Sequence, residues 1–144
     1  MKLLILNGPN LNLLGLREPE LYGKQDYNAL CEQLRLWSAE AGAECEIIQS
    51  NHEGVLVDAI QQAYFDGVDG IVINPAAYTH TSVAILDALK AVRLPAVEVH
   101  LTDISKREPF RQISYPGMAC LKTFAGLGFE GYHQAILFLK EYLK

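Results

Sequence analysis

Short apolar runs alternate with stretches of helical periodicity along this chain. Residues 2–7, 45–49, 70–74 and 96–100 are typical of buried strands, and residues 119–123 form a weaker fifth run. Between these runs apolar side chains recur at spacings of three and four, and the same spacing continues from Tyr132 to Leu143. The pattern therefore predicts five short strands separated by amphipathic helices.

Capping residues indicate where these helices begin and end. Asp26 is a candidate N-cap, residues 50–53 have the form of a capping box, and Thr81 is a candidate cap for a helix over residues 83–92. Glycine or proline follows three of the helical stretches and is expected to end them, at Gly42, Gly67 and Pro95.

Strands that are apolar on both faces and alternate with helices are expected in a parallel sheet that is covered on both sides. The chain is therefore predicted to be a single α/β domain, a flavodoxin-like three-layer sandwich with a five-stranded parallel sheet of order 2-1-3-4-5. In such sheets ligands bind at the carboxyl ends of the strands, where the winding reverses. The polar residues after the first, third and fourth strands (7–22, 74–80 and 98–111) are thus expected to converge on one site.

Composition narrows the class of protein. The chain has 144 residues, of which 50% are apolar and 20% are charged, and its net charge of −5 argues against a nucleic-acid partner. No apolar run is long enough to cross a bilayer and no signal-like segment opens the sequence, so a cytoplasmic protein without a membrane partner is expected. The three cysteines, Cys31, Cys45 and Cys120, are expected to be reduced thiols.

Glu98 and His100 are candidates for proton transfer. They lie two residues apart at a strand end and therefore on one face, where the carboxylate can orient the imidazole. The alternative is a histidine that only satisfies its hydrogen bonds in a polar rim.

Arg107 and Arg111 are candidates for binding an anion. Pro109 between them is a favoured first helical residue, which puts Arg111 in the first helical turn. A cation there opposes the helix dipole unless an anion or another polar partner compensates it, which points to a ligand. Solvated surface arginines are the alternative.

Arg17 and Tyr22 share a long segment that also contains Pro19 and Gly23. A tyrosine has an unperturbed pKa of about 10, and a guanidinium beside it favours the phenolate and lowers that value. The pair is therefore a candidate base with its activator, and the proline and glycine suit a lid over residues 17–24 that closes on a ligand. A tyrosine that only packs is the alternative.

Asn74 and His80 are candidate hydrogen-bonding partners for a hydroxylated or carboxylated small molecule, whereas Thr79 and Thr81 are better explained as helix caps. The four histidines lack metal-ligand spacing, so no metal site is predicted. The residues after the first and third strands suit neither a flavin-binding flavodoxin nor a phospho-receiver domain. Neither GxGxxG nor GxxxxGK[ST] occurs, so no nucleotide is expected.

Five segments of the chain closely resemble the type II 3-dehydroquinate dehydratases. They are NGPNLNLLGLREPELYG (7–23), QSNHEG (49–54), INPAAYTHTSVAILDAL (73–89), EVHLTDISKREPFR (98–111) and GLGFEGYHQAI (126–136). These segments span nearly the whole chain in the family's order. The resemblance implies a lyase of the shikimate pathway that converts 3-dehydroquinate to 3-dehydroshikimate through an enolate, without cofactor or metal.

The resemblance also implies catalytic roles. Tyr22 matches the base that removes a proton beside the ketone, and Arg17 matches the lid arginine that keeps this tyrosine ionised. Asn12 matches the residue that stabilises the enolate oxygen through a water. His100 matches the general acid for the departing hydroxyl, with Glu98 behind it.

Substrate-binding residues and an assembly are implied in the same way. The matching residues are Asn74, His80, Leu101, Thr102, Arg107 and Arg111, with Arg107 adding positive field at the base. Asp87 matches a residue that reaches the site of a neighbouring subunit in the family's trimers, four of which commonly form a dodecamer.

Some positions depart from the family pattern. Thr102 and Asp103 stand where Ser-Asn is typical, and Asp103 would weaken the binding of an anionic substrate if it pointed inward. Leu86 replaces a residue that is often basic, and residues 116–124 fit poorly. Asp103 leaves one alternative open, a catalytically silent flavodoxin-like module that binds a small anion or assembles a ring. A dehydratase of quinate breakdown is a second alternative, because dehydroquinate also arises in that route.

Overall fold

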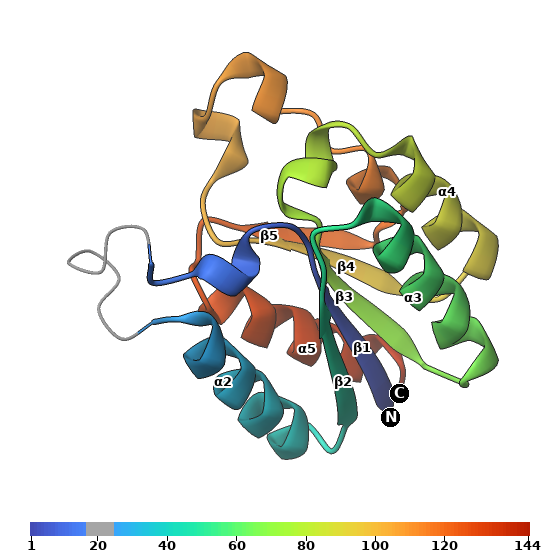
Figure 1. The fold of residues 1–144 in the computed structure, drawn as a ribbon. Coiled ribbons are helices and arrows are strands. Elements are labelled where there is room, and N and C mark those ends of the chain that lie inside the picture. Colours follow the sequence, from blue (N-terminus) through green and yellow to red (C-terminus); the bar gives the residue numbers. More distant parts are fainter. Residues whose placement is uncertain (17–24) are drawn as a thin grey trace.

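Five parallel strands form one sheet in the order β2-β1-β3-β4-β5 (Figure 1). The computed structural model describes residues 1–16 and 25–144 of the chain. The strands are β1 (Lys2–Asn7), β2 (Glu44–Gln49), β3 (Gly70–Asn74), β4 (Ala96–His100) and β5 (Lys122–Ala125). The predicted flavodoxin-like α/β class and strand order are confirmed.

Helices cover both faces of this sheet, which gives three layers (Figure 1). The helices are α2 (Tyr27–Glu40) and α5 (Glu130–Tyr142) on one face and α3 (Glu53–Phe65) and α4 (Val83–Val92) on the other. Successive side chains of a strand point to opposite faces, so Leu3 and Ile5 of β1 pack with α2 and α5 while Leu4 and Leu6 pack with α3 and α4. Burial on both faces explains why the central strands read as continuous apolar runs.

Helix capping agrees with the sequence at one helix and differs at two others. The Asp26 side chain accepts a hydrogen bond from Ala29 N at 2.8 Å, as predicted for the N-cap of α2. At α4 the cap is Ser82, whose Oγ accepts from Ile85 N at 2.9 Å, so the prediction of Thr81 was wrong by one residue. The predicted capping box over residues 50–53 does not form, because the Ser50 hydroxyl is engaged in a tighter turn, accepting from His52 N at 3.0 Å.

The fifth strand was predicted over residues 119–123, but it begins three residues later, at Lys122. Pro116–Ala119 form a short 3-10 helix, which Cys120 N closes by donating to the carbonyl oxygen of Gly117 at 3.1 Å. Strand pairing begins only when Leu121 N donates to the carbonyl oxygen of Ala96 at 2.8 Å. The proline-led turn thus delays the strand and sets its register against β4.

Short 3-10 helices gather at the carboxyl ends of the strands. They are Leu11–Leu13 after β1, Ala76–His80 after β3, and Ile104–Lys106 and Pro109–Arg111 after β4. The first two of these connections touch, because Gly8 N donates to the carbonyl oxygen of Asn74 at 2.8 Å and a Cβ at Gly8 would overlap the carbonyl oxygen of Pro75. In the part of the chain that the structure describes, no helix is both long and apolar enough to cross a membrane.

Candidate active site

A buried tyrosine joins the ends of β1 and β3. The Tyr132 hydroxyl, from α5, donates to Asn7 Oδ1 at 2.7 Å and accepts from Asn74 Nδ2 at 3.0 Å. Asn7 and Asn74 pair in register on neighbouring strands, and Asn74 Oδ1 also accepts from Ala76 N at 3.1 Å. The candidate Asn74 is therefore held by both of its amide atoms, and the sequence had placed Tyr132 only on an apolar helix face.

Two tyrosines near this network are unsuited to act as bases at neutral pH. Burial raises the pKa of Tyr27 to about 12, and burial also raises the pKa of Tyr132 well above its ordinary value. The candidate base Tyr22 and its partner Arg17 lie outside the described residues.

The candidate acid His100 ends β4 next to its expected carboxylate. His100 Nε2 lies 2.9 Å from Glu98 Oε2, and both side chains are almost fully buried. Nε2 has no well-directed hydrogen bond among the described residues, and its contact with the carboxylate is an ion pair when the ring is protonated. The two-residue spacing thus places them on one face as predicted, and Nδ1 is the ring nitrogen that does not face Glu98.

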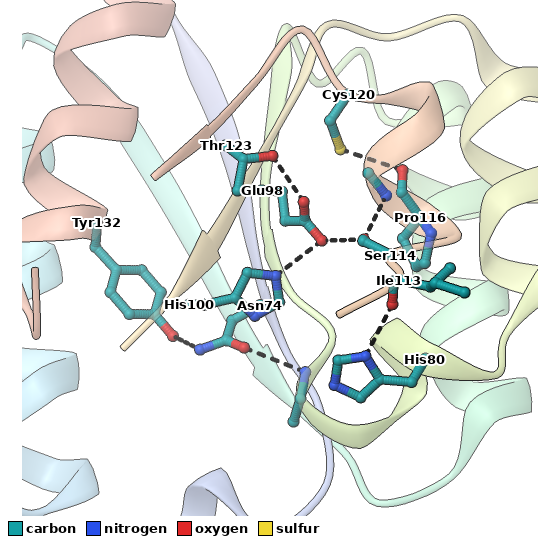
Figure 2. A network of polar contacts seen from close by, with 12 residues as sticks. Asn74, His80, Glu98, His100, Ile113, Ser114, Pro116, Cys120, Thr123 and Tyr132 are labelled. Carbon is teal, nitrogen blue, oxygen red and sulfur yellow. Dashed lines mark hydrogen bonds and ion pairs between the residues drawn. The ribbon is translucent and has the colours of Figure 1, made fainter. Parts of the chain in front are cut away.

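Two hydroxyl groups hold the Glu98 carboxylate (Figure 2). Ser114 Oγ donates to Glu98 Oε2, and Thr123 Oγ1 donates to Glu98 Oε1 at 2.7 Å. Burial by itself would raise the pKa of Glu98, but contact with His100 and these two hydroxyl groups lower it below its ordinary value. Glu98 is therefore ionised at neutral pH although it is buried.

Neither hydroxyl group was predicted from the sequence. Thr123 pairs with Glu98 in the β4–β5 register, so the signal was present but required the correct placement of β5. Ser114 lies in a connection without periodicity, and no local signal marks it.

His80 is oriented by the connection that follows β4. Its Nδ1 lies 2.8 Å from the carbonyl oxygen of Ile113, which can only accept, so Nδ1 carries the proton. In the neutral ring Nε2 is then free to accept a hydrogen bond. Ile113 and Ser114 are consecutive, so one segment contacts both His80 and the carboxylate behind His100 (Figure 2).

The two candidate arginines lie in that same segment. Arg111 Nε donates to Glu108 Oε2 at 2.5 Å, so the compensating anion in its short helix is a neighbouring side chain. From the sequence, a bound ligand was the expected source of this negative charge. Arg107 Nη1 donates to Thr102 Oγ1 at 3.5 Å, a long and exposed contact.

Leu101 and Asp103, which directly follow β4, form hydrogen bonds with nearby segments. The Leu101 carbonyl oxygen accepts from Gly128 N at 3.1 Å, which ties this end of β4 to the connection after β5. Asp103 Oδ1 accepts from Ser105 N at 3.0 Å and Ser105 Oγ at 2.6 Å, and these bonds lower the pKa of Asp103 below its ordinary value. The Asp103 carboxylate is thus used to cap its own turn.

Asn12 and Asp87 lie in different surroundings. Asn12 Oδ1 accepts from Gln49 Nε2 at 3.4 Å, and the same amide donates to the Gly8 carbonyl oxygen at 3.1 Å, so β2 supports the connection after β1. Asp87 is exposed on α4. Of the candidate residues that the structure describes, it is the one that belongs to a helix surface rather than to a strand end.

Other predictions concern cysteines, metals and caps. Cys31, Cys45 and Cys120 are free thiols, as predicted. In residues 1–16 and 25–144, no cluster of three or more histidine, cysteine or acidic side chains is arranged to hold a metal ion. Thr79 is buried with its hydroxyl group unpartnered among the described residues, so it does not cap the following helix.

Comparison with known proteins gives relatives of the same length. The family model Dehydroquinase class II matches residues 1–140. A "3-dehydroquinate dehydratase" of Clostridium perfringens (strain 13 / Type A) is 49% identical over 100% of this chain and 99% of its own. One of Carboxydothermus hydrogenoformans is 50% identical over 100% of this chain and 93% of its own.

Solved structures agree with the sequence comparison. The type II dehydroquinase of Butyrivibrio crossotus superposes with a TM-score of 0.92 at 48% identity, covering 96% of this chain and 97% of that one. The enzyme of Propionibacterium acnes gives a TM-score of 0.88 at 37% identity, covering 97% and 98%. With strand order, length and sequence all in agreement, the chain belongs to the class II dehydroquinase family.

Proposed function

We propose that this protein dehydrates 3-dehydroquinate to 3-dehydroshikimate in the shikimate pathway. The observation that carries the proposal is the buried Glu98–His100 pair at the end of β4, one strand away from the anchored amide of Asn74, in a chain of this family. A dehydration beside a ketone needs a base, a group that stabilises the enolate, and an acid for the departing hydroxyl.

The first step is removal of a proton from the carbon beside the ketone. We assign it to Tyr22, kept ionised by Arg17 with Arg107 adding positive field, which is supported by the resemblance of residues 7–23 to the family. The enolate oxygen is then stabilised by Asn12 through a water. Gln49 contacts this amide from β2 through one long, exposed hydrogen bond.

The second step is loss of the hydroxyl group as water. His100 donates a proton to the departing oxygen as its bond to carbon breaks, and the electrons of the enolate form the new carbon–carbon double bond. Nδ1 is the ring nitrogen suited to this transfer, because Nε2 faces Glu98. The ionised carboxylate stabilises the imidazolium form that the acid requires. These steps require neither metal nor cofactor.

The substrate's carboxylate and hydroxyl groups are assigned to the groups around this acid. They are Asn74, His80, Arg107, Arg111 and the backbone at Leu101 and Thr102. His80 supports the assignment chemically, since a protonated Nδ1 leaves Nε2 to accept from a substrate hydroxyl. Arg111 would exchange part of its pairing with Glu108 for the substrate carboxylate.

The assembly and location are further parts of the proposal. We assign residues 1–144 to one catalytic domain, and the lid assigned to residues 17–24 lies outside the described residues. The exposed position of Asp87 on α4 agrees with a residue that reaches a neighbouring subunit in a trimer, and four trimers form a dodecamer. The protein acts in the cytoplasm without a nucleic-acid or membrane partner.

No feature of the described residues favours the alternative of a silent anion-binding module. Asp103, the change that leaned toward it, uses its carboxylate to cap its own turn through Ser105.

The test follows the ultraviolet absorbance of the conjugated enone product after chelator-treated protein is mixed with 3-dehydroquinate. A steady rise without added metal or nucleotide is expected. A folded protein that gives no rise would overturn the proposed function and restore the binding module. Light scattering of the same sample gives the mass, which should be twelve times that of one chain.

A further inference from the structure

Glu98 is held at both carboxylate oxygens by hydroxyl groups from two distant parts of the chain. Ser114 comes from the connection after β4, and Thr123 comes from the neighbouring strand β5 (Figure 2). Glu98 is 1% exposed, so water cannot replace either donor. The carboxylate can therefore neither turn about its last bond nor move along β4 without losing a buried hydrogen bond.

The position of the carboxylate determines the position of the imidazole. His100 Nε2 and Ser114 Oγ share the same oxygen, Glu98 Oε2, with the nitrogen at 2.9 Å. Since this nitrogen has no well-directed hydrogen bond of its own, the imidazole is oriented by its electrostatic contact with the carboxylate. A rotated carboxylate would therefore move the ring and the proton that it gives away.

The turn of residues 116–119 packs closely against Ser114 and Glu98. Gly117 N donates to Ser114 Oγ at 2.9 Å, so the serine hydroxyl is itself fixed. A Cβ at Gly117 would lie 2.5 Å from Glu98 Oε1 and 2.7 Å from Ser114 Oγ. Glycine at this place lets the turn of residues 116–119 close against the carboxylate.

We propose that Ser114 and Thr123 are positioning residues for the proton transfer by His100 and act on it through Glu98. The inference rests on the proposed function, because it concerns the acid of that reaction. Two hydroxyl donors keep the carboxylate ionised inside the protein and aim it at the ring. Each hydroxyl group contributes without touching the substrate.

The charge balance around Glu98 agrees with this role. Contact with His100 and the two hydroxyl groups outweigh burial and lower the pKa of Glu98. Burial and the Glu98 charge raise the pKa of the nearby Cys120 thiol to about 12. Cys120 therefore stays neutral and adds no second negative charge beside Glu98.

The test compares kcat, KM and the pH dependence of kcat for Ser114→Ala, Thr123→Val and the wild type. A hydrogen bond to a charged group contributes enough that each loss should lower kcat about tenfold. KM should stay within about twofold, because neither hydroxyl group is a substrate contact. A carboxylate that is partly released stabilises the imidazolium less, so the alkaline limb of the kcat profile should move about one unit lower in pH.

Two further variants separate orientation from general damage. Thr123→Ser retains the hydroxyl group and should restore both kcat and the alkaline limb. Ser38→Ala removes a buried hydroxyl group of α2 that has no partner among the described residues, and it should change neither quantity.

The possible outcomes divide clearly. A normal kcat in Thr123→Val, or a raised KM with an unmoved alkaline limb in both variants, would overturn the proposal and indicate a role in loop structure. If Ser114→Ala does not fold, Thr123→Val and Thr123→Ser decide the question from the strand side. An inactive wild type would instead refute the proposed function itself, so the two failures are distinguishable.

Discussion

Replacing Tyr132 by phenylalanine should destabilise the protein, because two buried asparagine side chains lose their hydrogen-bond partner. The ring of Tyr132 is fully buried, and phenylalanine retains it, so packing with α2 and the sheet is preserved. What disappears is the hydroxyl group that donates to Asn7 Oδ1 at 2.7 Å and accepts from Asn74 Nδ2 at 3.0 Å.

The size of the effect follows from the buried partners. Asn7 Oδ1 loses its donor and Asn74 Nδ2 loses its acceptor, while both residues are almost inaccessible to water. A buried polar group left without a partner costs about 1–3 kcal/mol, so the loss of two partners should lower the free energy of unfolding by about 2–6 kcal/mol. That is a large part of the total of about 5–15 kcal/mol that a typical domain has.

Urea unfolding at one fixed chain concentration measures this loss, because assembly would make the stability depend on concentration. Tyr142→Phe is the matched control, since that tyrosine is 55% exposed and its replacement should change stability by less than about 0.5 kcal/mol. Burial raises the pKa of Tyr132, so the hydroxyl group stays protonated and the difference should be equal at pH 6 and pH 8.

A loss no larger than that of the control would refute the reasoning, because it would mean that the two asparagines find new partners. The same variant also tests the site. A released Asn74 amide should raise KM for 3-dehydroquinate while the fold, seen by circular dichroism, is unchanged.

Four other predictions follow. Tyr22→Phe should abolish turnover with the fold and assembly intact, because only the ionisable oxygen is lost; near-normal rates would require another base. Arg17→Ala should raise the pKa of the base and move the acidic limb of the kcat profile to higher pH, and an unmoved limb would contradict this account of the tyrosine. The pKa of Glu98 is lowered in the folded protein, so its ionised form stabilises the fold above the pKa it has in the unfolded chain, and this contribution is lost as pH falls through the folded value. Glu98→Gln should therefore flatten the loss of stability between about pH 5 and pH 3 in urea titrations. An equally steep loss would mean that other carboxylates are responsible. Gly117→Ala should lower kcat and cost about 1–3 kcal/mol in urea unfolding, because its Cβ would lie 2.5 Å from Glu98 Oε1, whereas a wild-type rate would show that the turn can move aside.

The sheet and its order were predictable because the strands of a parallel sheet are buried on both faces and read as apolar runs. The same physics placed Glu98 and His100 on one face, since successive side chains of a strand alternate. Prediction failed where a turn, rather than periodicity, determines the structure. Pro116 opens a short helix that delays β5, and with β5 displaced, the pairing of Thr123 with Glu98 could not be seen.

Connections were harder to predict than strands for the same reason. The hydroxyl group of Ser114 reaches Glu98 only because the segment after β4 folds back over the sheet edge, and no local pattern encodes that path. Arg111 shows a related limit, because the argument from its helix position did not include Glu108, which lies three residues earlier and pairs with it. Short-range ion pairs of this kind are available to almost any charged loop and carry little information about function.

The bridge between Asn7, Asn74 and Tyr132 has a consequence for how this family can diverge. Each of the three side chains satisfies another, so changing any one of them leaves a buried amide or hydroxyl group unpaired. A lineage could replace the trio by apolar residues only through intermediates that are less stable than either end point. Random mutagenesis with selection for stability should therefore recover single substitutions at these three positions less often than at other buried positions, even when no substrate is supplied.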